Sequence, residues 1–553
     1  MEDFSRKVGT SCLLLILLLV VMGFIPAMSI GGVDLKRINI LSELSLSDKS
    51  FDFNYDSNYD FGADFDPNIE IPDVVALELD EEEYQIDLHE VSASAAEARE
   101  LLAMLSDETN ETNDSVNSID STNSDNSTTQ IDPQDLNTLQ IDTTRLLKEA
   151  KLTPIENFDS TEFTSLDRLY TKLNTPNATI RIAVLGDSFI EGDIITCDLR
   201  EIFQSRYCGC GTGFAPIDSP LTRYRKTIKT TSSGWTTYNV MQKRTTPEDL
   251  APYYPVSGWV SKPENGATTK WEGSEARKYL NSWGETHILF RCDSRTVIET
   301  VVNDTDLQTH TFDGKNMVQQ IKLTQPDIHS VSLKIVSGAE GFIGYGAIFN
   351  SPQKDGGVCV DNYSIRSNNG QAMLWTNPSV NVQIDHLVGG YDLVILQYGL
   401  NIMQKGVNNY TRYGAQVEKM IAYVKECFPQ AAVLVMGVSD RSMKEDGTYR
   451  PMSEAPRLTH YQRQAAHNAG VAFWSTYDAM QAQGGMSNFV SEGWAAKDFT
   501  HINLAGGRQI AMALADALIF DHYKCCPLIV RHDHENIIQP ISNEVVVGSI
   551  SIE

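Results

Sequence analysis

Two short segments far apart in the chain carry residue types that could perform acyl transfer. The first is Gly-Asp-Ser at 186–188, which follows an apolar run at 180–185 typical of a buried strand and precedes a helical pattern. A serine at such a turn lies at the carboxyl edge of an α/β sheet, where the helix N-terminus offers free backbone N–H groups. The second segment supplies a base, His501, and a carboxylate, Asp498. Together they indicate a serine esterase.

These residue types complement one another in a catalytic triad. The hydroxyl of Ser188 is a weak nucleophile while protonated and needs a base. His501 can take that proton and return it to the leaving alcohol, and Asp498 can fix the tautomer of the imidazole. Asp187 is expected to support the turn rather than to react.

Two further segments follow the same α/β pattern. One spans 362–370, and the other is Tyr-Gly-Leu-Asn at 398–401, directly after an apolar strand. The four segments, in this order, resemble the SGNH (GDSL-type) hydrolase family over 150–222 and 357–520. The resemblance implies an α/β fold with a three-layer, flavodoxin-like parallel sheet.

The resemblance also implies an oxyanion hole. Its donors would be the backbone N–H groups of Ser188 and Gly370 and the side-chain amide of Asn401. The register of the second segment is loose, because Ser367 stands where related sequences often carry glycine. In the third segment Ile402 replaces a usual aspartate, but the asparagine persists.

A narrower resemblance, over 192–216, is to the peptidoglycan O-acetylesterase branch of the family. Those enzymes carry a β-sandwich domain between the first two segments, and 223–356 of this chain contains short β-type runs separated by turn residues. Related envelope enzymes often have His and Gln where this chain has Phe189 and Glu191, which bears on substrate preference.

Four aromatic residues of the inserted segment have two possible roles. They could form a sugar-stacking surface or belong to the core of the sandwich. These residues are Trp235, Tyr238, Trp259 and Trp271.

The N-terminal part of the chain predicts export. An apolar run at 12–25 follows Arg6 and Lys7, so 1–30 is either a signal peptide, cleaved after Ser29, or a membrane anchor. The sequence therefore predicts a protein of the periplasm or cell envelope, attached to the membrane if that segment is uncleaved.

The acidity of the chain is concentrated in one segment. The net charge is −29, and 34–149 alone holds 29 acidic and 6 basic residues. We expect 31–149 to be an acidic, largely disordered linker. No basic stripe indicates a nucleic-acid partner.

The remaining sequence divides into four segments. We expect a hydrolase domain in two parts, 150–222 and 357–524. A β-sandwich is expected between them at 223–356, and a tail at 525–553. Within the second hydrolase part, helices are expected at 413–427, 457–469 and 505–519 and strands at 391–397, 432–437 and 471–474. The nine cysteines permit disulfides but lack zinc-ligand spacing, and no metal or cofactor is expected.

The expected function is an exported serine esterase that removes O-acetyl groups from peptidoglycan, another cell-envelope glycan or an extracellular glycan. A glycan O-acetyltransferase would share the triad and differ only in whether a sugar hydroxyl or water attacks the acyl-enzyme. A lipid esterase would need a large apolar acyl pocket. A tethered glycan-binding protein is the non-enzyme alternative, and the sequence leaves the oligomeric state open.

Overall fold

The computed structural model describes residues 86–111 and 152–525, except 221, 223–224, 243–245 and the side chains of 105–111. It also describes two short antiparallel strands nearer the N-terminus, β1 (Ser29–Ile30) and β2 (Val33–Asp34). The expected apolar run at 12–25, most of the acidic linker and the tail from 526 onward lie outside the described residues. No helix of the described part is long and apolar enough to cross a membrane.

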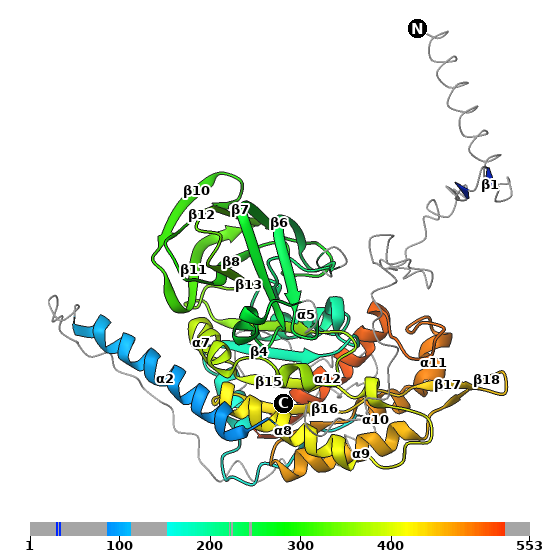
Figure 1. The fold of residues 1–553 in the computed structure, drawn as a ribbon. Coiled ribbons are helices and arrows are strands. Elements are labelled where there is room, and N and C mark those ends of the chain that lie inside the picture. Colours follow the sequence, from blue (N-terminus) through cyan, green and yellow to red (C-terminus); the bar gives the residue numbers. More distant parts are fainter. Residues whose placement is uncertain are drawn as a thin grey trace, which may run out of the picture. The chain divides into compact units, whose positions relative to one another are not determined.

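A six-stranded sheet forms the centre of the α/β part of residues 152–525 (Figure 1). Its strands read as continuous apolar runs, which is typical of strands buried on both faces. Five strands are parallel and only β3 is antiparallel. In spatial order they are β14 (Gly357–Ser364), β4 (Thr179–Gly186), β15 (Leu393–Gln397), β16 (Ala432–Met436), β19 (Ala472–Trp474) and β3 (Glu156–Asn157).

The order of the five parallel strands is that of the flavodoxin-like doubly wound fold. The chain builds β4 first, adds β14 on one side of it, and then adds β15, β16 and β19 in turn on the other side. The direction of winding therefore reverses at β4. Ligands bind at the carboxyl ends of the strands beside such a reversal.

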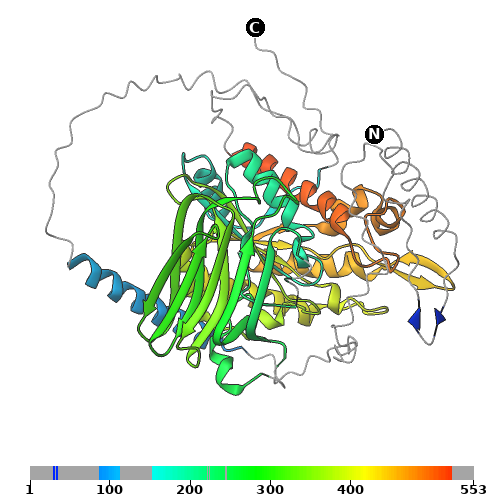
Figure 2. The same ribbon diagram turned by 90° about the horizontal axis from the view of Figure 1, so that it is seen from above.

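Helices cover both faces of this sheet, so the expected three-layer arrangement is confirmed (Figure 2). One face carries α4 (Ser165–Leu173), α5 (Thr196–Tyr207) and α12 (Leu504–Cys525). The other carries α6 (Gln371–Leu374), α7 (Pro378–Val388), α8 (Thr411–Cys427) and α9 (Glu454–Asn468). Two short helices follow β19, α10 (Thr476–Ala482) and α11 (Gly485–Ser491). The helices and strands expected after 390 are confirmed, with ends shifted by a few residues.

The helix expected directly after the Gly-Asp-Ser turn begins later than predicted. A turn at 187–190 and a short 3-10 helix, η3 (Glu191–Asp193), separate β4 from α5. The N-terminus of α5 is therefore eight residues beyond Ser188 and does not supply donors at the serine. Gly192 and Asp193 have φ values of 64° and 67°, which turn the chain before the helix begins.

The inserted segment folds as an antiparallel domain of nine strands. They are β5 (Gly213–Ala215), β6 (Lys229–Asn239), β7 (Trp259–Glu272), β8 (Trp283–Cys292), β9 (Thr296–Val302), β10 (Asp306–Phe312), β11 (Lys315–Ile328), β12 (Ser330–Ser337) and β13 (Phe342–Asn350). A short 3-10 helix, η4 (Glu248–Tyr253), lies between β6 and β7. β5 begins ten residues before the expected boundary at 223, because it pairs with β13.

The antiparallel strands form two halves. β6, β7, β12, β9 and β10 form one half, and β5, β13, β8 and β11 form the other. The halves share a single residue pair, Gly344 with Ser261. Aromatic rings meet between them: Trp271 on β7 contacts Phe349 on β13, with ring centroids 5.7 Å apart. The domain therefore encloses its own apolar core.

One helix was missed within the predicted linker. α2 (Leu88–Glu111) packs on α7 and α8, and Ala95 and Ala98 are buried against Val382. The small residues at helical spacing let the helix lie close to α7, while its other face stays acidic. The linker prediction is therefore wrong at 88–111. The seven described cysteines are all free thiols.

Candidate active site

The turn after β4 exposes one residue and buries its neighbours. Asp187, Phe189 and Ile190 are buried, whereas Ser188 is half-buried. Oδ1 of Asp187 accepts the backbone N–H of Phe189 at 2.9 Å, which supports the turn as expected. A Cβ on Gly186 would lie 2.8 Å from the carbonyl oxygen of Gln397, so only glycine fits where β4 meets β15. The serine hydroxyl is thus presented at the edge of the sheet.

The backbone N–H of Ser188 lies in the same turn as its hydroxyl. This N–H has no hydrogen-bond acceptor among the described residues. They also include no hydrogen bond between Ser188 and His501, a contact that often tightens only when substrate binds. The turn itself, and not α5, therefore presents a free donor beside the nucleophilic hydroxyl.

The side chains of Asp498 and His501 are in hydrogen-bond contact in the loop just before α12. Nδ1 of His501 lies 2.7 Å from Oδ2 of Asp498, and both side chains are about half exposed. Partial burial opposes ionisation of Asp498, but hydrogen bonds from the His501 side chain and from the backbone of Thr500 and His501 lower its pKa to about 2. A carboxylate ionised at neutral pH holds Nδ1 protonated and leaves Nε2 as the basic nitrogen.

This loop lies against the segment that follows the nucleophile. A Cβ on Gly507 of α12 would lie 1.9 Å from the carbonyl oxygen of Ile194. Gly507 is six residues after His501, and Ile194 is six residues after Ser188. The close backbone contact explains the glycine and brings the two chemistry-bearing segments to the same end of the sheet.

A hairpin made of β17 (Ser442–Glu445) and β18 (Thr448–Pro451) holds the loop from the other side. The rings of Tyr449 and Phe499 are stacked with centroids 3.8 Å apart, and the backbone N–H of Ser442 donates to the carbonyl of Phe499 at 3.0 Å. Phe499 has a φ of 57°, which is costly for a residue with a side chain. These contacts keep that conformation in place.

Arg441, just before the hairpin, joins two of the loops. Its Nε donates to Oγ1 of Thr500 at 3.1 Å, and its Nη1 donates to the carbonyl of Met403 at 3.3 Å. Met403 is the residue directly after the short helix η5 (Leu400–Ile402), which contains Asn401. Nothing in the sequence singled out Arg441 except its place after an apolar strand. Its role depends on contacts across the fold.

The side-chain amide of Asn401 lies beside the nucleophile turn. Nδ2 donates to Oδ2 of Asp187 at 3.0 Å and to the carbonyl of Asn368 at 2.9 Å. The amide therefore joins the segments after β4, β14 and β15. The structure thus brings Ser188, Asn401 and the 498–501 loop to the carboxyl edge of the sheet beside β4.

The fold is similar to that of a solved structure of a peptidoglycan O-acetylesterase. That structure matches 67% of this chain and 99% of its own, with a TM-score of 0.51 and 19% sequence identity. The chain has the SGNH-hydrolase fold. No protein-family model matches the sequence, and no curated protein matches it.

Two other solved structures are similar over parts of the chain. A family two carbohydrate esterase from Clostridium thermocellum, in complex with cellohexaose, covers 49% of this chain and 96% of its own, with 11% identity and a TM-score of 0.22. A GDSL-like lipase from Parabacteroides merdae covers 30% of this chain and 74% of its own, with 17% identity and a TM-score of 0.23. The assignment of the SGNH fold rests on the first structure.

Within the SGNH fold, Gly370 does not present a free donor. Its backbone N–H donates to Oδ1 of Asn368 at 2.9 Å. It is buried with a φ of 95°, and a Cβ there would lie 2.0 Å from Sδ of Met420. The glycine therefore serves close packing at the start of α6. A contribution of Gly370 to the oxyanion hole would require this hydrogen bond to be broken.

Ser367, three residues earlier, has the geometry expected of that donor. It has a φ of 57°, a region that favours glycine, and its backbone N–H has no acceptor among the described residues. The next residue, Asn368, accepts from the amide of Asn401. The loose register noted in the sequence at Ser367 already pointed to this position.

Ion pairs connect the segments at this edge of the sheet. Glu191, one of the departures from the family pattern, is buried and accepts from Nε of Arg366 at 3.0 Å. Asp193 is fully buried and lies 2.8 Å from Nη2 of Arg225 and 3.4 Å from Nη1 of Arg200. Arg225 belongs to the segment that leads into β6, so this pair links the antiparallel domain to the turn after the nucleophile.

Burial also changes the ionisation of two of these carboxyl groups. Burial raises the pKa of Asp187 to about 7, against the hydrogen bond from Phe189 and the charge of His501. Burial acts in the same direction on Asp193, but Arg200 and Arg225 outweigh it and hold the pKa of that carboxyl well below its usual range. The described residues contain no group of three or more His, Cys, Asp or Glu side chains that could hold a metal ion.

The candidate aromatic residues divide between core and surface. Trp271 is completely buried in the core of the antiparallel domain. Trp235, Tyr238 and Trp259 are half-buried. Only these three retain a surface that could contact a ligand.

Proposed function

We propose that this protein is an exported serine esterase that removes O-acetyl groups from a cell-envelope or extracellular glycan. The observation that carries the proposal is the 2.7 Å contact between Nδ1 of His501 and Asp498, on a loop packed against the segment that follows Ser188. Export rests on the apolar run at 12–25. The glycan is proposed because the structure with a TM-score of 0.51 is a peptidoglycan O-acetylesterase.

The reaction proceeds in two acyl-transfer steps. Nε2 of His501 takes the proton of the Ser188 hydroxyl as Oγ attacks the acetyl carbonyl, and then returns it to the departing sugar oxygen. Water, activated by the same nitrogen, attacks the acetyl-serine and releases acetate. Asp498 stabilises the imidazolium that forms in each step.

The oxyanion is held by donors from three segments. They are the backbone N–H groups of Ser188 and Ser367 and the amide of Asn401, with Ser367 in place of Gly370. Both hydrogens of the Asn401 amide are already bonded, to Asp187 and Asn368. As the oxyanion forms, the Asn401 amide gives up one of these two hydrogen bonds and donates to the oxyanion instead. Removing one such donor typically lowers the rate by about 100- to 1000-fold.

The test is hydrolysis of p-nitrophenyl acetate, butyrate and octanoate by the full chain and by Ser188→Ala and His501→Ala. His386→Ala is the matched control, because His386 is exposed near the C-terminal end of α7, which leads into the start of β15, whereas the candidate site lies beyond the end of that strand. We expect turnover selective for acetate that both triad variants lose and the control keeps. Activity that survives Ser188→Ala would overturn the proposal.

Acetate release from O-acetylated peptidoglycan and O-acetylated xylan then tests the substrate class. Transfer of acetyl to an added acceptor glycan, without free acetate, would instead identify an acetyltransferase. Preference for octanoate over acetate would identify a lipid esterase. Glycan binding with no turnover of any ester would identify a binding protein.

A further inference from the structure

A cavity lies where the antiparallel domain meets the carboxyl edge of the parallel sheet. About 450 Å³ of space lies between its walls, and part of this space is open solvent at its mouth. Part of its lining comes from the turn after the nucleophile and from the end of β14, through Gly192 and Ser364. The rest comes from the antiparallel domain and includes Phe214, Ser257 and Trp259.

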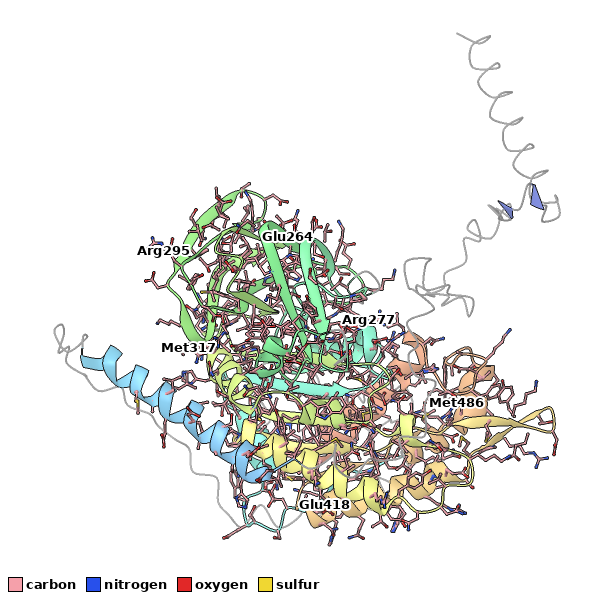
Figure 3. All side chains as sticks on the ribbon, viewed as in Figure 1. Glu264, Arg277, Arg295, Met317, Glu418 and Met486 are labelled. Atoms are coloured by element: carbon pink, nitrogen blue, oxygen red, sulfur yellow. The ribbon has the colours of Figure 1, made fainter. Side chains whose placement is uncertain are left out.

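The lining from the antiparallel domain is packed directly on the segment beside the nucleophile. A Cβ on Gly258 would lie 2.2 Å from Cδ1 of Ile365. The backbone N–H of Ile365 donates to the carbonyl of Gly186 at 3.0 Å, two residues before Ser188. Ser257 and Trp259, on either side of Gly258, therefore belong to a part of the antiparallel domain that packs against the segment after β14. Figure 3 marks the opposite, outer end of the same domain with Glu264 and Arg295.

Two side chains of this lining have unused polar groups. Ser257 is only 2% exposed, and its hydroxyl has no hydrogen-bond partner in the described part of the chain. Buried hydroxyl groups in proteins are normally bonded. The indole of Trp259 is half-buried, and no described residue accepts its N–H. A bound molecule would supply the missing partners.

The two charged residues in the described lining are paired with each other. Oδ2 of Asp193 lies 2.8 Å from Nη2 of Arg225, and Arg200, which does not border the cavity, lies 3.4 Å from the same carboxyl group. The described lining therefore presents no unpaired charge. An aromatic face combined with a few hydroxyl groups suits a sugar ring, which has apolar C–H faces and a polar rim.

We propose that this cavity binds one neutral pyranose residue of the glycan, stacked on Trp259 and hydrogen-bonded to the hydroxyl of Ser257. The inference rests on the proposed function, because it places this sugar beside the acetylated one. A long acyl chain could fill the same space but would leave the buried hydroxyl of Ser257 unbonded.

Calorimetric titration of the full-length Ser188→Ala protein tests this without requiring turnover. The probes are chitotetraose, cellotetraose and xylotetraose. We expect at least one to bind, with Trp259→Ala weakening the affinity by about tenfold or more and Ser257→Ala by at least about threefold. Trp259→Phe, which keeps an aromatic face, should restore most of the affinity and shows that the loss is not caused by misfolding.

Trp235→Ala is the matched control. Trp235 is a half-buried tryptophan of the same domain, but its Nε1 donates to the carbonyl of Thr268 and it does not border the cavity. Its affinity for the probes should equal that of the parent. No binding of any probe, or equal binding by Trp259→Ala, overturns the sugar subsite even if the esterase is active. If the probes bind in a manner that depends on Trp259 but the wild-type protein has no esterase activity, the proposed function is wrong and the sugar subsite stands.

Discussion

The side-chain amide of Asn401 donates a 3.0 Å hydrogen bond to Oδ2 of Asp187, a carboxyl group with no exposed surface. The residue that is proposed to hold the oxyanion is therefore itself oriented by the residue before the nucleophile. Since burial raises the pKa of Asp187 to about 7, the charge beneath the active site changes near neutral pH. This coupling has a measurable effect on stability.

Asp187→Asn should remove a pH dependence of stability. The pKa of Asp187 is about 7 in the folded protein and 3.8 as its ordinary value. Between these values the folded state keeps a proton that the unfolded state has released, so stability falls as pH rises from about 4 to 7 and is then constant. The full effect is at most about 4 kcal/mol, from about 1.4 kcal/mol for each unit. An asparagine cannot ionise.

Thermal melting of both proteins at pH 5 and pH 8 measures this effect. The melting temperature of Asp187→Asn, relative to that of the wild type, should be higher at pH 8 than at pH 5. Burial also raises the pKa of Asp385 to about 7, but that group is common to both proteins and cancels in the difference. A constant difference between the two melting temperatures would show that Asp187 stays ionised.

Asn401→Ala should reduce kcat by about 100- to 1000-fold, because it removes a donor to the oxyanion. The change in KM for p-nitrophenyl acetate should be small, since the donor acts mainly in the transition state. Asn409→Ala is a suitable control, because Asn409 caps the start of α8 through Thr411 and lies outside the site. An equal loss in both variants would exclude a catalytic contribution from the Asn401 amide.

The sequence predicted the parts of this site that follow from local pattern. Ser188 and Asn401 were found because each comes directly after an apolar strand, and parallel strands end at the same edge of a sheet. His501 was found because it shares a short segment with Asp498. The local sequence around Ser188, Asn401 and His501 was therefore enough to select these three residues.

Features that depend on the register of a turn or on contacts across the fold could not be predicted in the same way. Gly370 was chosen for its residue type, but hydrogen bonding shows that its N–H is taken by Asn368. Helix α2 was assigned to the linker because acidic composition outweighed the small residues that bury one face. Arg441 has no sequence signal, since Thr500 is 59 residues away.

Substitution of the two residues with positive φ in the second segment should affect stability to very different extents. Gly370→Ala introduces a Cβ 2.0 Å from Met420 at a φ of 95°, and we expect it to lower stability by more than about 2 kcal/mol. Ser367→Gly relieves about 1–2 kcal/mol of backbone strain but adds about 0.5–1 kcal/mol of chain entropy to the unfolded state, so stability should change little. Melting temperatures of the two variants decide this. A Gly370→Ala protein as stable as wild type would contradict the packing described at α6.

Asp193→Asn should be strongly destabilising. It leaves Arg200 and Arg225 buried without their counter-charge, and the loss of one partner of a buried pair typically costs about 3–5 kcal/mol. Asparagine tolerates the φ of 67° at this position, so backbone strain does not add to the effect. Asp304→Asn breaks an exposed pair with Lys270 and should cost less than about 1 kcal/mol. Chemical denaturation compares the two, and equal effects would show that the junction of the domains does not depend on Asp193.

Arg441 is expected to act as a positioning residue for the catalytic loops. Its guanidinium contacts both Thr500, beside His501, and Met403, beside Asn401. A lysine presents a single charged group and cannot make both contacts in that geometry. Arg441→Lys should therefore lower kcat on the order of tenfold through misalignment of base and oxyanion donor, with a smaller effect on KM. Steady-state kinetics with p-nitrophenyl acetate measure both constants. Arg450→Lys, on the exposed strand of the same hairpin, is the control. If Arg441→Lys changes the melting temperature but not kcat, the contact serves only stability.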